Sequence, residues 1–217
     1  TMYTKTSSPA DDSRIVMPIF WGDDTGDELD RIYFQPIPGV DDISLNIYKG
    51  THTFPGPARY TVSVEDPNRN FGVLNILINP FLGYNTSVEL LNPPIDMGCV
   101  GKTFIHNPAA YDPDGDSLSY KLVVCKGAGG FDIPGYQFPI ATDFFRIDSI
   151  TGDMIWETPA LQGEYNVAFE IEEWRFGVKI SSVRRDMQIN ILACDHDPPE
   201  IYSIDDTCVV AGDFLQF

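Results

Sequence analysis

Positive charge is scarce in this chain. Its 217 residues include 14 Lys and Arg against 32 Asp and Glu, which gives a formal net charge of −18. Nucleic acids and anionic membrane surfaces repel such a protein. The composition therefore predicts no nucleic-acid partner, and it favours the binding of cations.

Long apolar runs and helical periodicity are also missing. No apolar stretch approaches the roughly 18 residues that a membrane-spanning helix needs, so we expect no membrane insertion. Apolar and polar residues instead alternate with a period of two, as they do in half-buried strands. The clearest alternating segments are residues 60–64, 118–124, 165–171 and 187–193.

Turn-forming residues divide these segments into short strands. The chain has 18 Gly and 17 Pro, spread over its whole length. Residues 164–173 and 178–193 flank Trp174-Arg175-Phe176-Gly177, a pattern that predicts a β-hairpin. The sequence thus predicts an all-β fold made of antiparallel, immunoglobulin-like β-sandwiches.

A partial repeat predicts where one sandwich ends and the next begins. Asn92-Pro93-Pro94-Ile95, followed by Cys99, recurs as Asp197-Pro198-Pro199-Glu200, followed by Cys208. The two cysteines lie 109 positions apart, close to the roughly 100 residues of one immunoglobulin-like sandwich. We expect two sandwiches in series, then a strand-like tail that opens a third domain or serves as a donor strand. Their predicted ranges are residues 1–91, 92–194 and 195–217.

The four cysteines favour disulfides over a metal site. Cys99, Cys125, Cys194 and Cys208 show neither the C-x-x-C spacing nor the paired histidines of a zinc site. An even number of cysteines in an acidic, β-rich chain fits an oxidising compartment. Because short loops close at lower entropic cost, we expect the pairs Cys99–Cys125 and Cys194–Cys208.

Three carboxylates alternate along one tight turn, Asp112-Pro113-Asp114-Gly115-Asp116, directly before a predicted strand. Oxygen ligands spaced in this way can converge on a hard cation such as Ca²⁺. An EF-hand is excluded, because Val123 occupies the place of its bidentate Glu. Asp, Pro and Gly are also ordinary turn formers, so a purely structural turn is the alternative.

Several motifs resemble known sandwich families. Residues 20–25 (Phe-Trp-Gly-Asp-Asp-Thr) and 52–62 resemble signatures of PKD-like domains. A cadherin-like repeat of the dystroglycan type is resembled by residues 111–120, 150–156 and 163–165 and by the linker at residues 195–199 (Asp-His-Asp-Pro-Pro). The tandem is similar to repeat regions of large gliding-motility-associated bacterial surface proteins that are exported by type IX secretion.

The resemblance implies a non-enzymatic structural or adhesive module of a bacterial surface protein or filament, at the cell surface or secreted. Its expected partners are neighbouring domains of the same type or other copies of the chain. The resemblance also implies a set of calcium ligands, which are Asp112, Asp114, Asp116, Glu164, Asp195 and Asp197. Residues 90–94, the linker before the second domain, carry no carboxylate. We therefore expect only a local, weak Ca²⁺ site.

A glycan-binding or surface-binding accessory module is the alternative function. The chain has none of the hydrolase, metalloprotease or P-loop motifs, so we expect no enzyme. Trp21 and Trp156 have core-like neighbours, whereas Trp174 beside the hairpin turn is the candidate for exposed contact with a glycan. An exposed aromatic patch near Trp174 would favour the binding module.

Overall fold

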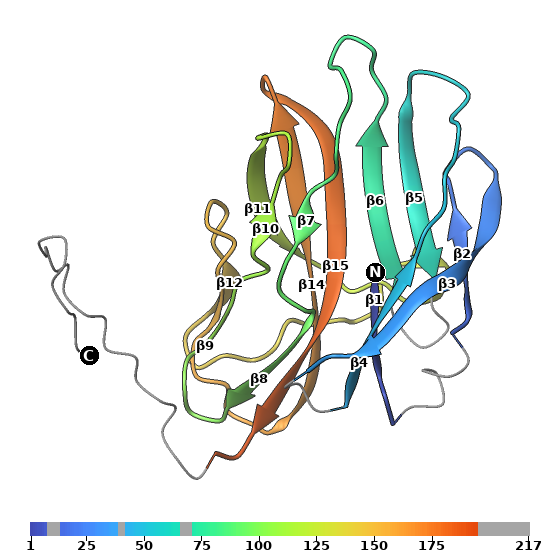
Figure 1. The fold of residues 1–217 in the computed structure, drawn as a ribbon. Coiled ribbons are helices and arrows are strands. Elements are labelled where there is room, and N and C mark those ends of the chain that lie inside the picture. The colour runs from blue at the N-terminus through green and yellow to red at the C-terminus, as the bar shows by residue number, and fades with distance from the viewer. Residues whose placement is uncertain (8–13, 39–41, 66–70, 195–217) are drawn as a thin grey trace, which may run out of the picture.

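The computed structural model describes residues 1–7, 14–38, 42–65 and 71–194 (Figure 1). Within these ranges the regular elements are β-strands, apart from one short 3-10 helix, η1 (Ala128–Gly130). Neighbouring strands pair antiparallel everywhere in the described residues except between β8 and β15. The predicted all-β, antiparallel class is therefore confirmed.

The strands fall into two groups along the chain. The first group is β1 (Met2–Lys5), β2 (Val16–Phe20), β3 (Gly26–Pro36), β4 (Ile43–Tyr48), β5 (Arg59–Glu65) and β6 (Phe71–Leu77). The second group is β7 (Glu89–Leu90), β8 (Ile95–Cys99), β9 (Phe104–His106), β10 (Ala110–Tyr111), β11 (Ser117–Val123), β12 (Phe145–Ile147), β13 (Met154–Trp156), β14 (Gly163–Arg175) and β15 (Val178–Leu192). The alternating segments of the sequence fall on β5, β11, β14 and β15.

The larger core lies in the second group, between the hairpin β14–β15 and the small sheet β12–β13–β9. Along much of β14 and β15, every second side chain faces this core and is buried, because successive side chains of a strand point to opposite faces of the sheet. Trp156 is fully buried there, and its Nε1 donates a hydrogen bond to the carbonyl of Ile140 at 3.1 Å. The prediction that Trp156 is a core residue is confirmed.

In the first group, one strand belongs to two ladders. The first half of β3 pairs with β2 and its second half pairs with β4, with a register shift between Arg31 and Tyr33. Such a bulge bends a strand and lets it pass from one sheet layer to another. Trp21 packs with Ile19 and Val62 in a second, smaller core, which confirms that Trp21 is a core residue too.

The two groups share backbone hydrogen bonds. Val73–Ile76 of β6 pair with Ser181–Arg184 of β15, so a ten-stranded sheet runs across the predicted junction after residue 91. Figure 1 shows β6 lying beside β15. The division into domains at residues 91 and 194 remains a prediction. The strands before and after residue 91 are hydrogen-bonded neighbours in one sheet. The tail, residues 195–217, lies outside the described residues.

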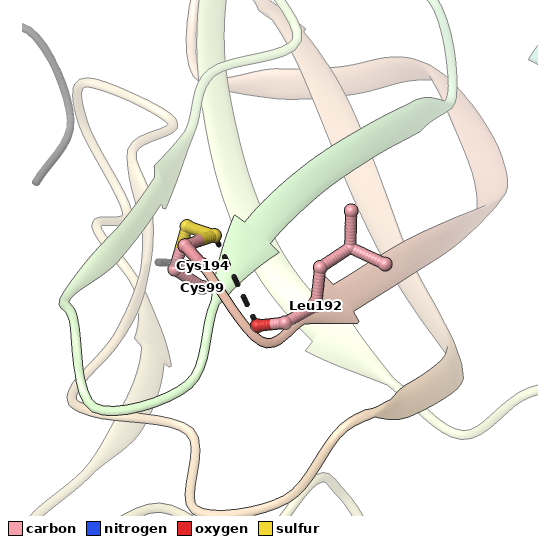
Figure 2. Close-up of a disulfide and its surroundings, with 3 residues drawn as sticks. All are labelled: Cys99, Leu192 and Cys194. Carbon is pink, nitrogen blue, oxygen red and sulfur yellow. Dashed lines mark hydrogen bonds between the residues drawn. A yellow bond between two sulfur atoms is a disulfide. The ribbon is translucent and has the colours of Figure 1, made fainter. Parts of the chain in front are cut away.

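A disulfide joins Cys99 to Cys194, with their Cα atoms 5.5 Å apart (Figure 2). The predicted pairs Cys99–Cys125 and Cys194–Cys208 are therefore wrong. The reason is the parallel pairing of β8 with β15, which sets Cys99 opposite Leu192, two residues before Cys194. The length of the loop between two cysteines does not reveal which strands pair, so it could not identify the partner of Cys99. Cys208 lies outside the described residues.

Cys125 is a buried free thiol, only 3% exposed. Burial raises the pKa of its thiol to about 11. Because the thiolate is the reactive form, we expect iodoacetamide to leave Cys125 unmodified in the native protein near pH 8 and to alkylate it after denaturation. Peptide mapping checks this, and rapid alkylation of Cys125 in the native protein would contradict the burial.

Candidate metal centre

Three carboxylates meet at one end of the larger core. Asp112, Asp116 and Glu173 each offer one oxygen, and the three oxygens lie within 4.8 Å of one another. Asp112 and Asp116 belong to the turn between β10 and β11, and Glu173 lies near the end of β14. The pairing of β11 with β14 brings them together, because Ser117, the residue after Asp116, lies opposite Trp174.

Asp112 shapes the turn with one oxygen. Its Oδ1 accepts the backbone N–H groups of Asp114 at 3.0 Å and of Asp116 at 2.9 Å. Gly115 supplies the positive φ, +80°, that this tight turn needs. Asp112 is only 6% exposed, and its Oδ2 accepts no hydrogen bond from any described residue. The same carboxylate therefore forms the turn and keeps a buried, unpartnered oxygen.

Glu173 is fully buried on the core face of β14. Within the part of the chain that the structure describes, neither of its carboxylate oxygens has a hydrogen-bond partner. Burial raises the pKa of Glu173 to about 7, and the negative charges of Asp112 and Asp116 contribute to the same shift. Asn85 and Ser181 lie close enough to lower this pKa in part.

Arg175 compensates one charge of the cluster. Its Nε and Nη2 donate to the two oxygens of Asp116 at 2.9 and 2.6 Å, a bidentate ion pair. Its Nη1 donates to the carbonyls of Leu82 and Tyr84, both at 2.8 Å, and Nη2 also donates to Oδ1 of Asn85 at 3.1 Å. Arg175 therefore fastens the loop between β6 and β7 to the Asp112 turn.

The other predicted ligands lie elsewhere. Asp114 lies beside the cluster of three but is not part of it: its Oδ2 accepts the backbone N–H of Thr86 at 2.6 Å and lies 3.5 Å from Nη2 of Arg175. Glu164 forms an ion pair with Lys5 at 3.0 Å near the opposite end of β14. Glu164 and Glu173 are nine positions apart along the strand, a distance of about 30 Å. The structure therefore does not bring Glu164 to the turn, and the predicted ligands Asp195 and Asp197 lie outside the described residues.

Glu173 and Arg175 were not predicted as site residues, although the sequence contains a signal for Glu173. The apolar series of period two on β14 includes Val167, Phe169 and Ile171, and the next member of this series is Glu173. A carboxylate at a position where the pattern calls for a core residue indicates a buried charge that needs a partner. The hairpin prediction placed Arg175 in the turn after residues 164–173, whereas the structure makes it the last residue of β14.

The hairpin tip beside the cluster exposes aromatic rings, but Trp174 is not the most exposed of them. Trp174 is half-buried, and its Nε1 donates to Oγ of Ser119 at 3.0 Å. Phe176 at the tip is 91% exposed, and the fully exposed Phe81 and Tyr84 lie in the loop that Arg175 fastens. One end of the molecule thus carries exposed aromatic side chains on two neighbouring loops.

The fold defines the class of this protein as all-β with an immunoglobulin-like β-sandwich closed by a disulfide. A scan against protein-family models finds no match, and a search of curated proteins finds no similar sequence. None of the described segments forms a helix long and apolar enough to cross a bilayer.

Proposed function

We propose that this chain is a non-enzymatic structural and adhesive module of an extracellular bacterial surface protein or surface filament. The observation that carries the proposal is the Cys99–Cys194 disulfide, which fastens β8 to the last long strand of the sheet. Structural disulfides persist in oxidising, extracellular environments. The partners in this proposal are neighbouring domains of the same type or other copies of the chain.

The residues of the PKD-like motif support a structural role. His52 stacks on Trp21, with ring centroids 4.8 Å apart, and its Nε2 lies 2.7 Å from Oδ2 of Asp23. Thr25 donates its hydroxyl to Oδ1 of Asp23, and Trp21 Nε1 donates to Asp27 at 2.7 Å. These contacts hold the turn after β2 against the smaller core. The residues of the motif therefore stabilise this turn.

Cell-surface labelling tests the proposal. We expect an antibody against the purified chain to label intact cells of the source organism, and external protease to remove the label. An antibody against a cytoplasmic protein serves as control, because its target stays protected until the cells are permeabilised. Labelling that requires permeabilisation would contradict the proposed location and, with it, the surface role.

Glycan binding is a second candidate function, and the exposed rings of Phe81, Tyr84 and Phe176 favour it. A contiguous patch of exposed apolar side chains often marks a binding site, whereas single exposed residues are common on any protein surface. In this proposal the rings stack on the apolar faces of neutral sugars, since the charge of −18 disfavours anionic glycans.

A glycan array tests the second candidate with matched variants. Changing Phe81, Tyr84 and Phe176 together to alanine is expected to abolish binding. A control variant replaces three exposed aliphatic residues that belong to neither of these loops, which are Ile105, Ile150 and Leu161. Equal binding by both variants, or no binding by the wild-type protein, would exclude the aromatic end as a glycan site.

A further inference from the structure

The strongest unexplained feature of the molecule is a group of buried acidic side chains whose charge Arg175 compensates only in part. Glu173 is fully buried with both oxygens unpartnered among the described residues, and Asp112 keeps one buried oxygen in the same condition. Folded proteins almost always pair buried polar atoms, and an unpaired charge in the interior is far more costly than a neutral group. The cluster therefore calls for a positively charged partner.

We infer that Asp112, Asp116 and Glu173 together bind one Ca²⁺ ion inside this end of the second sandwich. All three groups offer oxygen, which hard cations prefer over nitrogen or sulfur ligands. Two oxygens bound to one Ca²⁺ at 2.3–2.6 Å lie no more than about 5 Å apart. The limit of 4.8 Å between the carboxylate oxygens fits that requirement.

The charges of the cluster match a divalent ion. Once Glu173 is ionised, the three carboxylates exceed the single guanidinium of Arg175 by two negative charges, and Asp114, 3.5 Å from the same guanidinium, adds to this excess. Arg175 uses one lone pair on each oxygen of Asp116, and each carboxylate oxygen has a second lone pair available for an ion. Arg175 and Ca²⁺ therefore do not compete for the same position on Asp116.

Ser181 adds a neutral oxygen to the site. It lies directly opposite Glu173 on β15, so both side chains point to the same face of the sheet. Its hydroxyl is buried and has no hydrogen-bond partner in the described ranges. Three carboxylates, this hydroxyl and water together reach the six to eight ligands of Ca²⁺.

This site differs from the calcium site that the sequence resemblance implies. Its ligands come from a turn and a hairpin of one sandwich, and it needs neither the linker residues Asp195 and Asp197 nor Glu164. The inference also stands independently of the proposed surface function, because it rests only on the geometry and burial of the three carboxylates.

Terbium luminescence tests the site with the full, oxidised chain near pH 8. Tb³⁺ binds calcium sites, and Trp174, the residue that follows Glu173 in the chain, serves as the sensitiser of its emission. We expect emission on tryptophan excitation that Ca²⁺ removes by competition, with Mg²⁺ competing less well. Absence of sensitised emission, or emission that Ca²⁺ does not reduce, would overturn the inference.

Two variants and one control assign the binding to these residues. Glu173→Gln keeps the shape of the side chain and removes a ligand charge, and Asp112→Asn keeps the Oδ1 that accepts the turn N–H groups. Each is expected to weaken Ca²⁺ binding about tenfold or more. Glu164→Gln, on the same strand but paired with Lys5, is expected to bind as the wild type does.

Thermal melting separates loss of binding from loss of folding. Ca²⁺ at a concentration that saturates the wild type is expected to raise the melting temperature of the wild type clearly more than that of Glu173→Gln. In chelator, Glu173→Gln is expected to melt at a higher temperature than the wild type, because the variant lacks the buried charge. A wild type that melts identically in Ca²⁺ and in chelator would overturn the inference, as would an equal Ca²⁺ response in both proteins.

Discussion

Replacing Cys99 and Cys194 together with serine is expected to lower the free energy of unfolding by about 4 kcal/mol. The disulfide links residues 95 positions apart, so it removes much conformational entropy from the unfolded chain. Denaturant-induced unfolding of the oxidised wild type and the double variant measures the difference. Part of the effect arises where β8 and β15 meet, because the bond holds that parallel pair at its end.

Reductant provides the control for this prediction. It should destabilise the wild type by a similar amount and leave the double variant unchanged. Peptide mapping without reduction should recover Cys99 linked to Cys194 and Cys125 as a free thiol. Unfolding of the wild type that is insensitive to reductant would contradict the expected contribution of the disulfide.

The second large effect is a pH-dependent difference between the wild type and Glu173→Gln in chelator. The folded-state pKa of Glu173 is about 7, above its ordinary value of 4.5. Below about pH 4.5 the carboxyl is protonated in both the folded and the unfolded state, and its contribution to stability is fully present. As the pH rises from about 4.5 to about 7, the unfolded state loses this proton while the folded state still holds it. The contribution of Glu173 to stability therefore falls over this range and is lost once the pH passes 7.

Glutamine carries no proton to lose, so the variant is expected to be more stable than the wild type near pH 8, by about 3 kcal/mol. Near pH 4 the two proteins should differ little. Urea unfolding at a series of pH values measures the difference, with Glu164→Gln as an exposed control that shows no such trend. A constant difference between the wild type and Glu173→Gln across this range would contradict the buried position of Glu173.

Local patterns predicted much of the fold. The alternation along residues 164–173 and 178–193, together with the turn between them, predicted the hairpin β14–β15 almost to its ends. The core positions of Trp21 and Trp156 also followed from their neighbours in sequence. These features depend on interactions between residues that are close in the chain, and sequence periodicity reports such interactions directly.

Long-range pairings could not be predicted in this way. The pairing of β6 with β15 crosses the predicted domain junction, and that of β8 with β15 decides the partner of Cys99. Entropy of loop closure favoured nearby cysteines, but the register of a parallel strand pair outweighed it. For the candidate site, the sequence predicted Asp112 and Asp116, whereas Glu173 requires knowledge of which strand lies beside the turn.

Native mass spectrometry of the oxidised chain with Ca²⁺ tests the central claim most directly. The structure predicts one tightly held Ca²⁺ ion per chain in the wild type and in Glu164→Gln, and its loss in Glu173→Gln at the same calcium concentration. The same number of bound Ca²⁺ ions in the wild type and Glu173→Gln, or no retained ion in the wild type, would contradict a calcium site at Asp112, Asp116 and Glu173.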